Sequence, residues 1–472
     1  MPRSLAPFRA AAAAALLSAT LVRPAPAAAH TRLQSSRPAD HAAVGDTLRT
    51  LHLRFSEAVA PAMSVLELRL GDSVVARGAM RGDPADANAL DFALPGRLSP
   101  GGYVASWRAA SADGHVVRGT LAFTVEAAEP APAIAAASGF APRGDVAPGD
   151  GQPSADAGAM EDEGDSDAAA PLPVAVRWME FLALLGMIGS VSFHLLVIRR
   201  LRGGEMEKVA DRAEYGVWYL AAAAAALSLL TLLARLWLQS VALNGAADAF
   251  DGEMLNALLT GTVWGSGWIL QALATVAFFL GLMVARAPHG RSVGWMGSAV
   301  AALLLAAVPA LSGHAAAEER LTALAIASDW LHVLGAGVWL GTLAAVMLAG
   351  LPAAAFAGEG KATADFARIV AVFSPVALAG AGLAGATGVV NSLFHITAIP
   401  DLWRTGYGVM LLAKLALLAI VGAIGFYNWR FVLPTLQASE SPSRLRRTAG
   451  AELAAGLLVV LVTAILVALP PP

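Results

Sequence analysis

Eight long apolar segments, all from residue 173 onward, constrain the fold of this chain more than any other feature. Each has membrane-spanning length, since an α-helix needs about 20 apolar residues to cross the hydrocarbon core. Over the whole chain 57% of the residues are hydrophobic and 14% are charged, against about 25% charged residues in an average soluble protein. We therefore predict an all-α membrane domain at 173–472, with eight helices near 174–198, 213–240, 264–286, 292–311, 322–349, 366–392, 407–432 and 449–469.

The connectors between these segments differ in charge. The first, third, fifth and seventh connectors carry most of the Lys and Arg residues, whereas the others carry only Arg320 and Arg404. Cytoplasmic connectors of membrane proteins are enriched in Lys and Arg. The asymmetry predicts that the first helix starts outside the cytoplasm, and an even number of helices places the C-terminus outside as well.

Residues 1–29 have the features of a secretory signal peptide. Arg3 and Arg9 precede an apolar run that ends at Leu17, and Ala27-Ala28-Ala29 fits a small-residue cleavage site. The apolar run is shorter than the about 20 residues that a spanning helix needs. We expect cleavage to leave His30 as the first residue of an exported chain, in agreement with the orientation predicted from the connectors.

Residues 30–126 have the pattern of a small all-β domain. Apolar Leu51, Leu53 and Phe55 alternate with polar neighbours, as expected of a half-buried strand. Further strands are expected at 65–70 and 120–125, and turns at 71–72, 82–84 and 100–102. Short strands with frequent turns in about 100 residues indicate a β-sandwich.

Residues 127–172 lack apolar periodicity and are rich in Ala, Pro, Gly, Asp and Glu. Glu161-Asp162-Glu163 and Asp165 make the segment acidic, and Arg143 is its one basic residue. Such a composition cannot bury a core, so we predict an acidic disordered linker between the two domains.

Composition excludes several functional classes. The chain has no cysteine, which excludes disulfides, thiolate metal sites and cysteine nucleophiles. The formal net charge is -3 and there is no basic patch, so nucleic acid is not an expected partner. Neither a Walker A motif nor an ATPase phosphorylation motif is present, so ATP is not expected to drive the protein. A metal site in this chain must use His, Met, carboxylate or amine donors.

His30 gains a special property when it is the first residue of the chain. Its free amine and its imidazole Nδ1 can then bind one metal ion in a six-membered chelate ring, and nitrogen donors with a carboxylate suit Cu(II). Asp113 and His115 flank Gly114 and can point the same way from an extended segment. Spacing alone leaves two interpretations, a Cu(II) site or an ordinary cleavage-proximal histidine with a surface turn at 113–115.

Four segments resemble the CopC family of periplasmic copper proteins: residues 30–40, Phe55-Ser56-Glu57, residues 103–108 and residues 111–115. The membrane part resembles the CopD family, so the chain resembles a CopC–CopD fusion of the YcnJ type. The resemblance implies a cupredoxin-like or Ig-like Greek-key β-sandwich, Cu(II) ligation by His30, Asp113 and His115, and a role in copper uptake or resistance rather than in catalysis. Some CopC proteins also carry a methionine-rich Cu(I) site. Residues 30–126 contain only Met63 and Met80, so none is expected here.

Ionisable residues within membrane helices are functional candidates, because they are costly to place in lipid. His332 lies in the outer half of the fifth predicted helix, and Asp329 lies three residues earlier on the same face. His314 and His395 are at the outer ends of the fourth and sixth helices, where each is either a ligand or an interfacial residue. Met410, a soft ligand or a packing residue, completes the predicted path for Cu(I) or Cu(II).

Four more residues extend this list. Met179 and Glu180 begin the first helix at the level of the outer histidines, although Met179 is alternatively a packing residue. Lys414 either belongs to the path or neutralises Glu180 or Asp329 between helices. His194, near the cytoplasmic end of the first helix, is either an inner relay or an ordinary boundary residue.

The leading interpretation is a copper acquisition protein of a bacterial cytoplasmic membrane. The outer β-domain captures Cu(II), and the membrane domain passes copper inward. The expected partners are the copper ion, the lipid bilayer and a periplasmic protein that donates copper. Two alternatives remain: a haem-binding electron-transfer protein with intramembrane histidines as axial ligands, and a copper-tolerance protein that binds copper without translocation.

Overall fold

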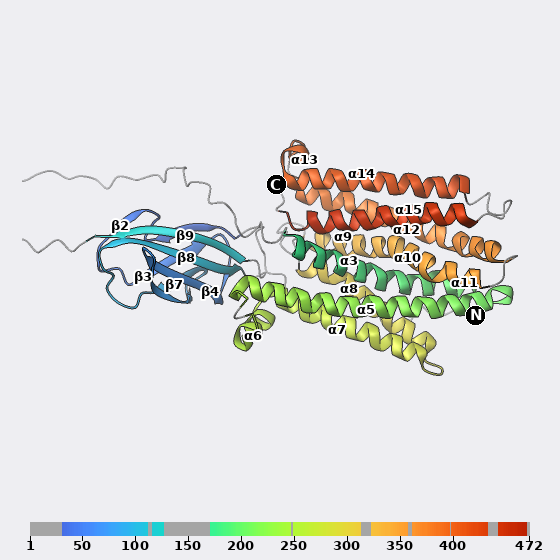
Figure 1. Ribbon diagram of the computed structural model, residues 1–472, viewed down its shortest axis with the longest axis horizontal. Coiled ribbons are helices and arrows are strands. Elements are labelled where there is room, and N and C mark those ends of the chain that lie inside the picture. Colours follow the sequence, from blue (N-terminus) through green and yellow to red (C-terminus); the bar gives the residue numbers. More distant parts are fainter. Residues whose placement is uncertain are drawn as a thin grey trace, which may run out of the picture. The chain divides into compact units, whose positions relative to one another are not determined.

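The computed structural model describes residues 31–111, 116–126, 170–246, 249–312, 322–356, 361–396, 398–432 and 442–469. The predicted signal peptide and the predicted linker up to residue 169 lie outside these residues. The chain forms two compact units, a β unit and a helical unit (Figure 1).

The β unit consists of two sheets. One sheet has the order β1-β3-β7-β6, and the other has the order β2-β9-β8-β4-β5. Neighbouring strands are antiparallel, except that β2 pairs in parallel with β9. The strands are β1 (Leu33–Arg37), β2 (Ala42–Val44), β3 (Thr50–Phe55), β4 (Val59–Leu70), β5 (Ser73–Ala79), β6 (Arg81–Asp83), β7 (Asp86–Ala93), β8 (Gly101–Ser111) and β9 (Val116–Val125).

Alternation along the strands places apolar side chains between the sheets. Leu51, Leu53 and Phe55 of β3 are fully buried, and Phe55 packs edge-on against Trp107 of β8 with ring centroids 5.3 Å apart. The predicted β-sandwich is therefore confirmed. The turn expected at 82–84 was placed too early, because β6 extends to Asp83 and pairs with β7.

Within the described residues, the helical unit has eight helices that are long and apolar enough to cross a membrane. Figure 1 shows them running side by side. The predicted number of spanning helices is therefore confirmed. Their parts are α3 (Pro171–Ser192), η1 (Phe193–Ile198) and α4 (Arg199–Leu201); α5 (Glu207–Asn244); α7 (Val263–Arg286); α8 (Arg291–Ser312); α9 (Thr322–Ala336), η4 (Gly337–Gly341), α10 (Thr342–Ala345), η5 (Val346–Gly350) and α11 (Leu351–Ala355); α12 (Ala362–His395); α14 (Gly406–Tyr427) and η6 (Asn428–Val432); and α15 (Pro442–Leu466).

Some helices begin earlier than the apolar runs from which they were predicted. α5 begins at Glu207 rather than near 213, and α15 begins at Pro442 rather than near 449. A helix that leaves the lipid can continue with polar residues, which hydropathy does not detect. Three short elements in the connectors were not predicted: η2 (Gly204–Met206), α6 (Gly252–Gly261) and α13 (Asp401–Arg404).

The first and fifth spanning helices cross at two glycines. A Cβ added to Gly341 would lie 2.0 Å from the carbonyl oxygen of Leu185, and one added to Gly189 would lie 2.0 Å from the carbonyl carbon of Gly341. The two backbones are therefore in direct contact, an approach that small residues permit between membrane helices. This crossing fixes α3, which carries Glu180, against the helix that carries His332.

We expect Gly341→Ala to destabilise the helical unit by about 1–3 kcal/mol, the usual cost of overpacking. Gly422→Ala on α14 is the matched control, because nothing lies within 4 Å of a Cβ at Gly422. The measurement is the fraction of monodisperse protein left in detergent after heating to a series of temperatures. Equal thermal stability of the two variants would contradict the close backbone contact.

Candidate metal centres

The three predicted Cu(II) ligands of the β unit, His30, Asp113 and His115, lie outside the described residues. Their nearest described neighbours in the chain are Thr31 on one side and Ser111 on the other. The contacts of these neighbours indicate which parts of the sandwich adjoin the predicted ligands.

Both neighbours contact residues 56–59, which comprise the connector after β3 and the first residue of β4. Thr31 Oγ1 donates to Glu57 Oε2 at 3.3 Å, and the backbone N–H of Arg32 donates to Ser56 Oγ at 2.9 Å. Val59, at the start of β4, pairs with Ser111 at the end of β8. The chain positions next to His30 and next to the 112–115 segment therefore lie at the same end of the sandwich.

Glu57 was missing from the predicted site residues. Its carboxylate accepts the hydrogen bond of Thr31, the residue that follows His30, and so it lies at the end of the sandwich where the predicted ligands enter. A carboxylate is a suitable oxygen donor beside imidazole nitrogens. Its position directly after a core strand was the sequence signal that could have identified it.

In the helical unit, His332 of α9 faces α12. Its Nδ1 lies 2.9 Å from the carbonyl oxygen of Ala384 and 3.3 Å from Thr387 Oγ1. A carbonyl oxygen only accepts hydrogen bonds, so Nδ1 carries the hydrogen and donates it. Nε2 then keeps its lone pair, which is the state in which a histidine ligates a metal.

Asp329 lies one turn before His332 and also faces α12. Its Oδ1 accepts a hydrogen bond from Asn391 Nδ2 at 3.4 Å. A Cβ added to Gly388 of α12 would lie 3.2 Å from His332 Cε1, so the absence of a side chain there leaves room for the imidazole. The structure thus brings Asp329 and His332 together against one neighbouring helix.

Lys414 of α14 interacts electrostatically with both Asp329 and His332. Between the two partners considered for Lys414, the structure therefore favours Asp329 over Glu180. Met410 lies one turn before Lys414 on the same helix and is half-buried.

Glu180 of α3 is buried and has other partners. Arg235 of α5 forms an ion pair with it, and Gln271 Nε2 of α7 donates to its Oε1 at 2.8 Å. A carboxylate already neutralised by an arginine is a poor cation ligand, so Glu180 mainly ties three helices together. Met179, the preceding residue, is half-buried.

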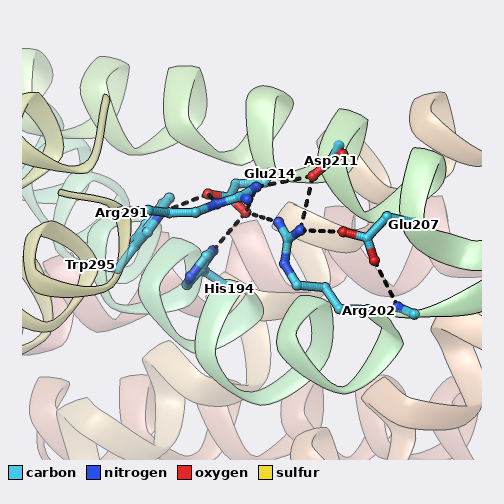
Figure 2. A network of polar contacts seen from close by, with 8 residues as sticks. His194, Arg202, Glu207, Asp211, Glu214, Arg291 and Trp295 are labelled. Carbon is cyan, nitrogen blue, oxygen red and sulfur yellow. Dashed lines mark hydrogen bonds and ion pairs between the residues drawn. The ribbon is translucent and has the colours of Figure 1, made fainter. Parts of the chain in front are cut away.

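His194 lies in the π-helical segment η1, within a separate polar network (Figure 2). Its ring stacks on Trp295 of α8 with centroids 4.2 Å apart. Its Nδ1 lies 3.7 Å from Glu214 Oε2, and Arg202 and Arg291 both bind Glu214. His194 therefore contacts a different set of residues from His332 and Asp329.

The side chains of the two outer histidines lie outside the described part of the structure. His314 lies outside the described residues, and His395 is described only as the last residue of the α12 backbone. Within the described ranges, no group of three or more His, Asp or Glu residues lies close enough to hold a metal ion. Thr387 and Asn391, which face His332 and Asp329, were missed by the sequence analysis because neutral polar residues carry no charge signal.

Three family models match the chain. The CopC domain matches residues 33–126, the N-terminal domain of the copper resistance protein D-like family matches residues 166–324, and copper resistance protein D matches residues 367–466. Asp329 and His332 lie between the last two matched segments.

Two known proteins resemble the chain. The copper transport protein CutJ of Bacillus subtilis is 30% identical over 377 residues, which cover 78% of this chain and 61% of CutJ. Copper resistance protein C of Xanthomonas campestris pv. juglandis is 32% identical over 128 residues, which cover 25% of this chain and 98% of that protein. The chain belongs to the CopC–CopD copper resistance family.

Solved structures also resemble the CopC part of this CopC–CopD chain. CopC from Methylosinus trichosporium OB3b is 30% identical and covers 21% of this chain and 98% of its own, with a TM-score of 0.20. PcoC, a methionine-rich copper resistance protein from Escherichia coli, is 30% identical and covers 21% of this chain and all of its own, with a TM-score of 0.19.

The two methionines of the CopC part are packing residues of the sandwich. Met63 and Met80 are 2% and 3% exposed and belong to the core of the sandwich. CutJ is named for copper transport, and copper resistance protein C for copper resistance. Copper is therefore the metal that this family handles.

Proposed function

We propose that this CopC–CopD protein acquires copper across a bacterial cytoplasmic membrane. The β unit lies outside the cytoplasm and captures Cu(II), and the helical unit passes copper inward. The name of CutJ, a copper transport protein, supports the same role. A periplasmic copper donor and the lipid bilayer are the proposed partners.

Capture uses the amine and imidazole of His30 together with Asp113 and His115. The hydrogen bond from Thr31 to Glu57 and the pairing of Val59 with Ser111 support this grouping, because they bring the flanking positions to one end of the sandwich. Glu57 is a further carboxylate at this end and joins the proposed ligand environment.

The inward path passes His332 and Asp329, with Met410 near the outer end of α14. A single observation carries this part of the proposal: the Ala384 carbonyl fixes the hydrogen of His332 on Nδ1 and leaves Nε2 as a ligand inside a membrane-spanning helix. His314 and His395 are the proposed outer ligands, because each follows an apolar run at the end that the connector charges indicate to be outside.

Charge favours import over export. A singly charged cation gains about 2.3 kcal/mol for every 100 mV when it moves to a negative interior. The excess of Lys and Arg in alternate connectors supports an orientation with His30 and the C-terminus outside.

Uptake of radioactive copper into proteoliposomes that contain the full chain tests the proposal. An inside-negative potential is expected to raise uptake well above that of protein-free vesicles, and an inside-positive potential to lower it. Parallel measurements with and without ascorbate identify the oxidation state that is carried. Uptake equal to that of protein-free vesicles at every potential would refute transport.

The haem alternative requires a second histidine opposite His332. The printed sequence places no histidine among the described α12 partners of His332, which are the Ala384 carbonyl and the Thr387 hydroxyl, both at Nδ1. The absorbance spectrum of the same purified protein is the direct check, because a Soret band would support electron transfer over copper import.

A further inference from the structure

A charged network of the helical unit, centred on the buried Glu214, takes no part in the proposed copper path. It joins α5, the segment after α4 and the start of α8, and His194 of η1 borders it (Figure 2). The ion-paired members of this network are Arg202, Glu207, Asp211, Glu214 and Arg291.

Glu214 is the centre of the network and has no free acceptor capacity. Its Oε1 accepts from Arg291 Nε at 2.6 Å and from Trp295 Nε1 at 3.2 Å. Its Oε2 accepts from Arg291 Nη2 at 2.6 Å and from Arg202 Nη2. A carboxylate offers about four lone-pair positions, and all of them are used here.

His194 faces this carboxylate without a hydrogen bond. The side chain is 4% exposed, and Nδ1 lies 3.7 Å from Glu214 Oε2, which is too far for a hydrogen bond. Among the described residues, Nδ1 has no hydrogen-bond partner at all. A buried polar atom without a partner calls for a physical explanation.

The charge of the network gives this explanation. Its three carboxylates and two guanidinium groups leave one negative charge, which a proton on His194 would balance. The other charged groups that face η1 are Arg199 and Arg200, which are exposed, and the ion-paired set Asp365, Arg368 and Glu205. A metal ion is disfavoured, because the lone pairs of Glu214 are already occupied.

We infer that His194 is a proton-binding site of the helical unit. The protonated imidazole would donate from Nδ1 to Glu214 Oε2 and displace the guanidinium of Arg202. Arg202 would remain bound to Glu207 and Asp211, each at 2.9 Å. Proton binding would therefore replace the contact between Arg202 and Glu214 with one between His194 and Glu214.

Trp295 reports the proton directly, because an imidazolium quenches an indole stacked against it. The emission of Trp295, taken as the difference between the wild type and Trp295→Phe, is expected to fall as the pH is lowered and His194 takes up the proton. His194→Gln is expected to lose this transition. His289→Gln, an exposed histidine between α7 and α8, is expected to keep it.

Asp211→Asn is a second variant, chosen because Asp211 is exposed and its loss removes one negative charge without opening the core. The midpoint of the Trp295 transition is expected to move to lower pH by about 0.3–1 unit, as for a charge several ångströms away. A transition that persists in His194→Gln, or an unchanged midpoint in Asp211→Asn, would overturn the proton site.

Discussion

His332→Gln is expected to lower copper uptake at least about tenfold, since even partners that only orient a metal ligand contribute 10–100-fold. Glutamine can still donate a hydrogen bond to the Ala384 carbonyl, which His332 Nδ1 contacts at 2.9 Å in the wild type. It cannot supply the imidazole Nε2. The variant therefore removes the proposed ligand and keeps the contact between α9 and α12.

The measurement is the initial rate of radioactive copper uptake in proteoliposomes, normalised to monodisperse protein. His289→Gln is the matched control, because this histidine is exposed on the turn between α7 and α8. A wild-type rate in His332→Gln would remove His332 from the copper path, even if the protein transports copper by another route.

Adding one residue in front of His30 is expected to weaken Cu(II) binding by more than about 100-fold, because the terminal amine becomes an amide and the chelate ring is lost. The change leaves every side chain of the sandwich in place. His115→Ala is expected to weaken binding as well, since it removes one of the two imidazoles.

Competitive Cu(II) titration of the full chain in detergent measures these affinities, and electron paramagnetic resonance counts the nitrogen ligands. His52→Ala is the matched control, because His52 Nδ1 pairs with Asp91 Oδ1 at 2.8 Å on the outer face of β3 and β7. Unchanged affinity in the extended protein would show that the terminal amine is not a ligand.

Local periodicity made most of the fold predictable. Leu51, Leu53 and Phe55 alternate with polar residues, and the structure buries all three between the sheets. The spanning helices follow from the length of the apolar runs. The start of α5 was not predictable in this way, because it lies in polar sequence, and the short helix α6 was not, because its 10 residues are too few to span a membrane.

The candidate site was predictable only within one helix. Asp329 and His332 are three residues apart, and helical geometry is sufficient to place them on one face. Their partners on α12 are far away in sequence: Ala384 follows His332 by 52 residues, and Asn391 follows Asp329 by 62 residues. No spacing rule connects such positions.

The sequence by itself determined the two-part architecture, the number of spanning helices and the residue types available to bind a metal. These properties are local, because strand alternation and apolar length depend only on near neighbours in the chain. Only the tertiary structure decided which charged groups share the interior. Glu180 pairs with Arg235, and Glu214 pairs with Arg291, which is 77 residues further along the chain. The packing of the helices selects these partners. Gly189 and Gly341 contribute to that packing, because they allow two helix backbones to come into contact.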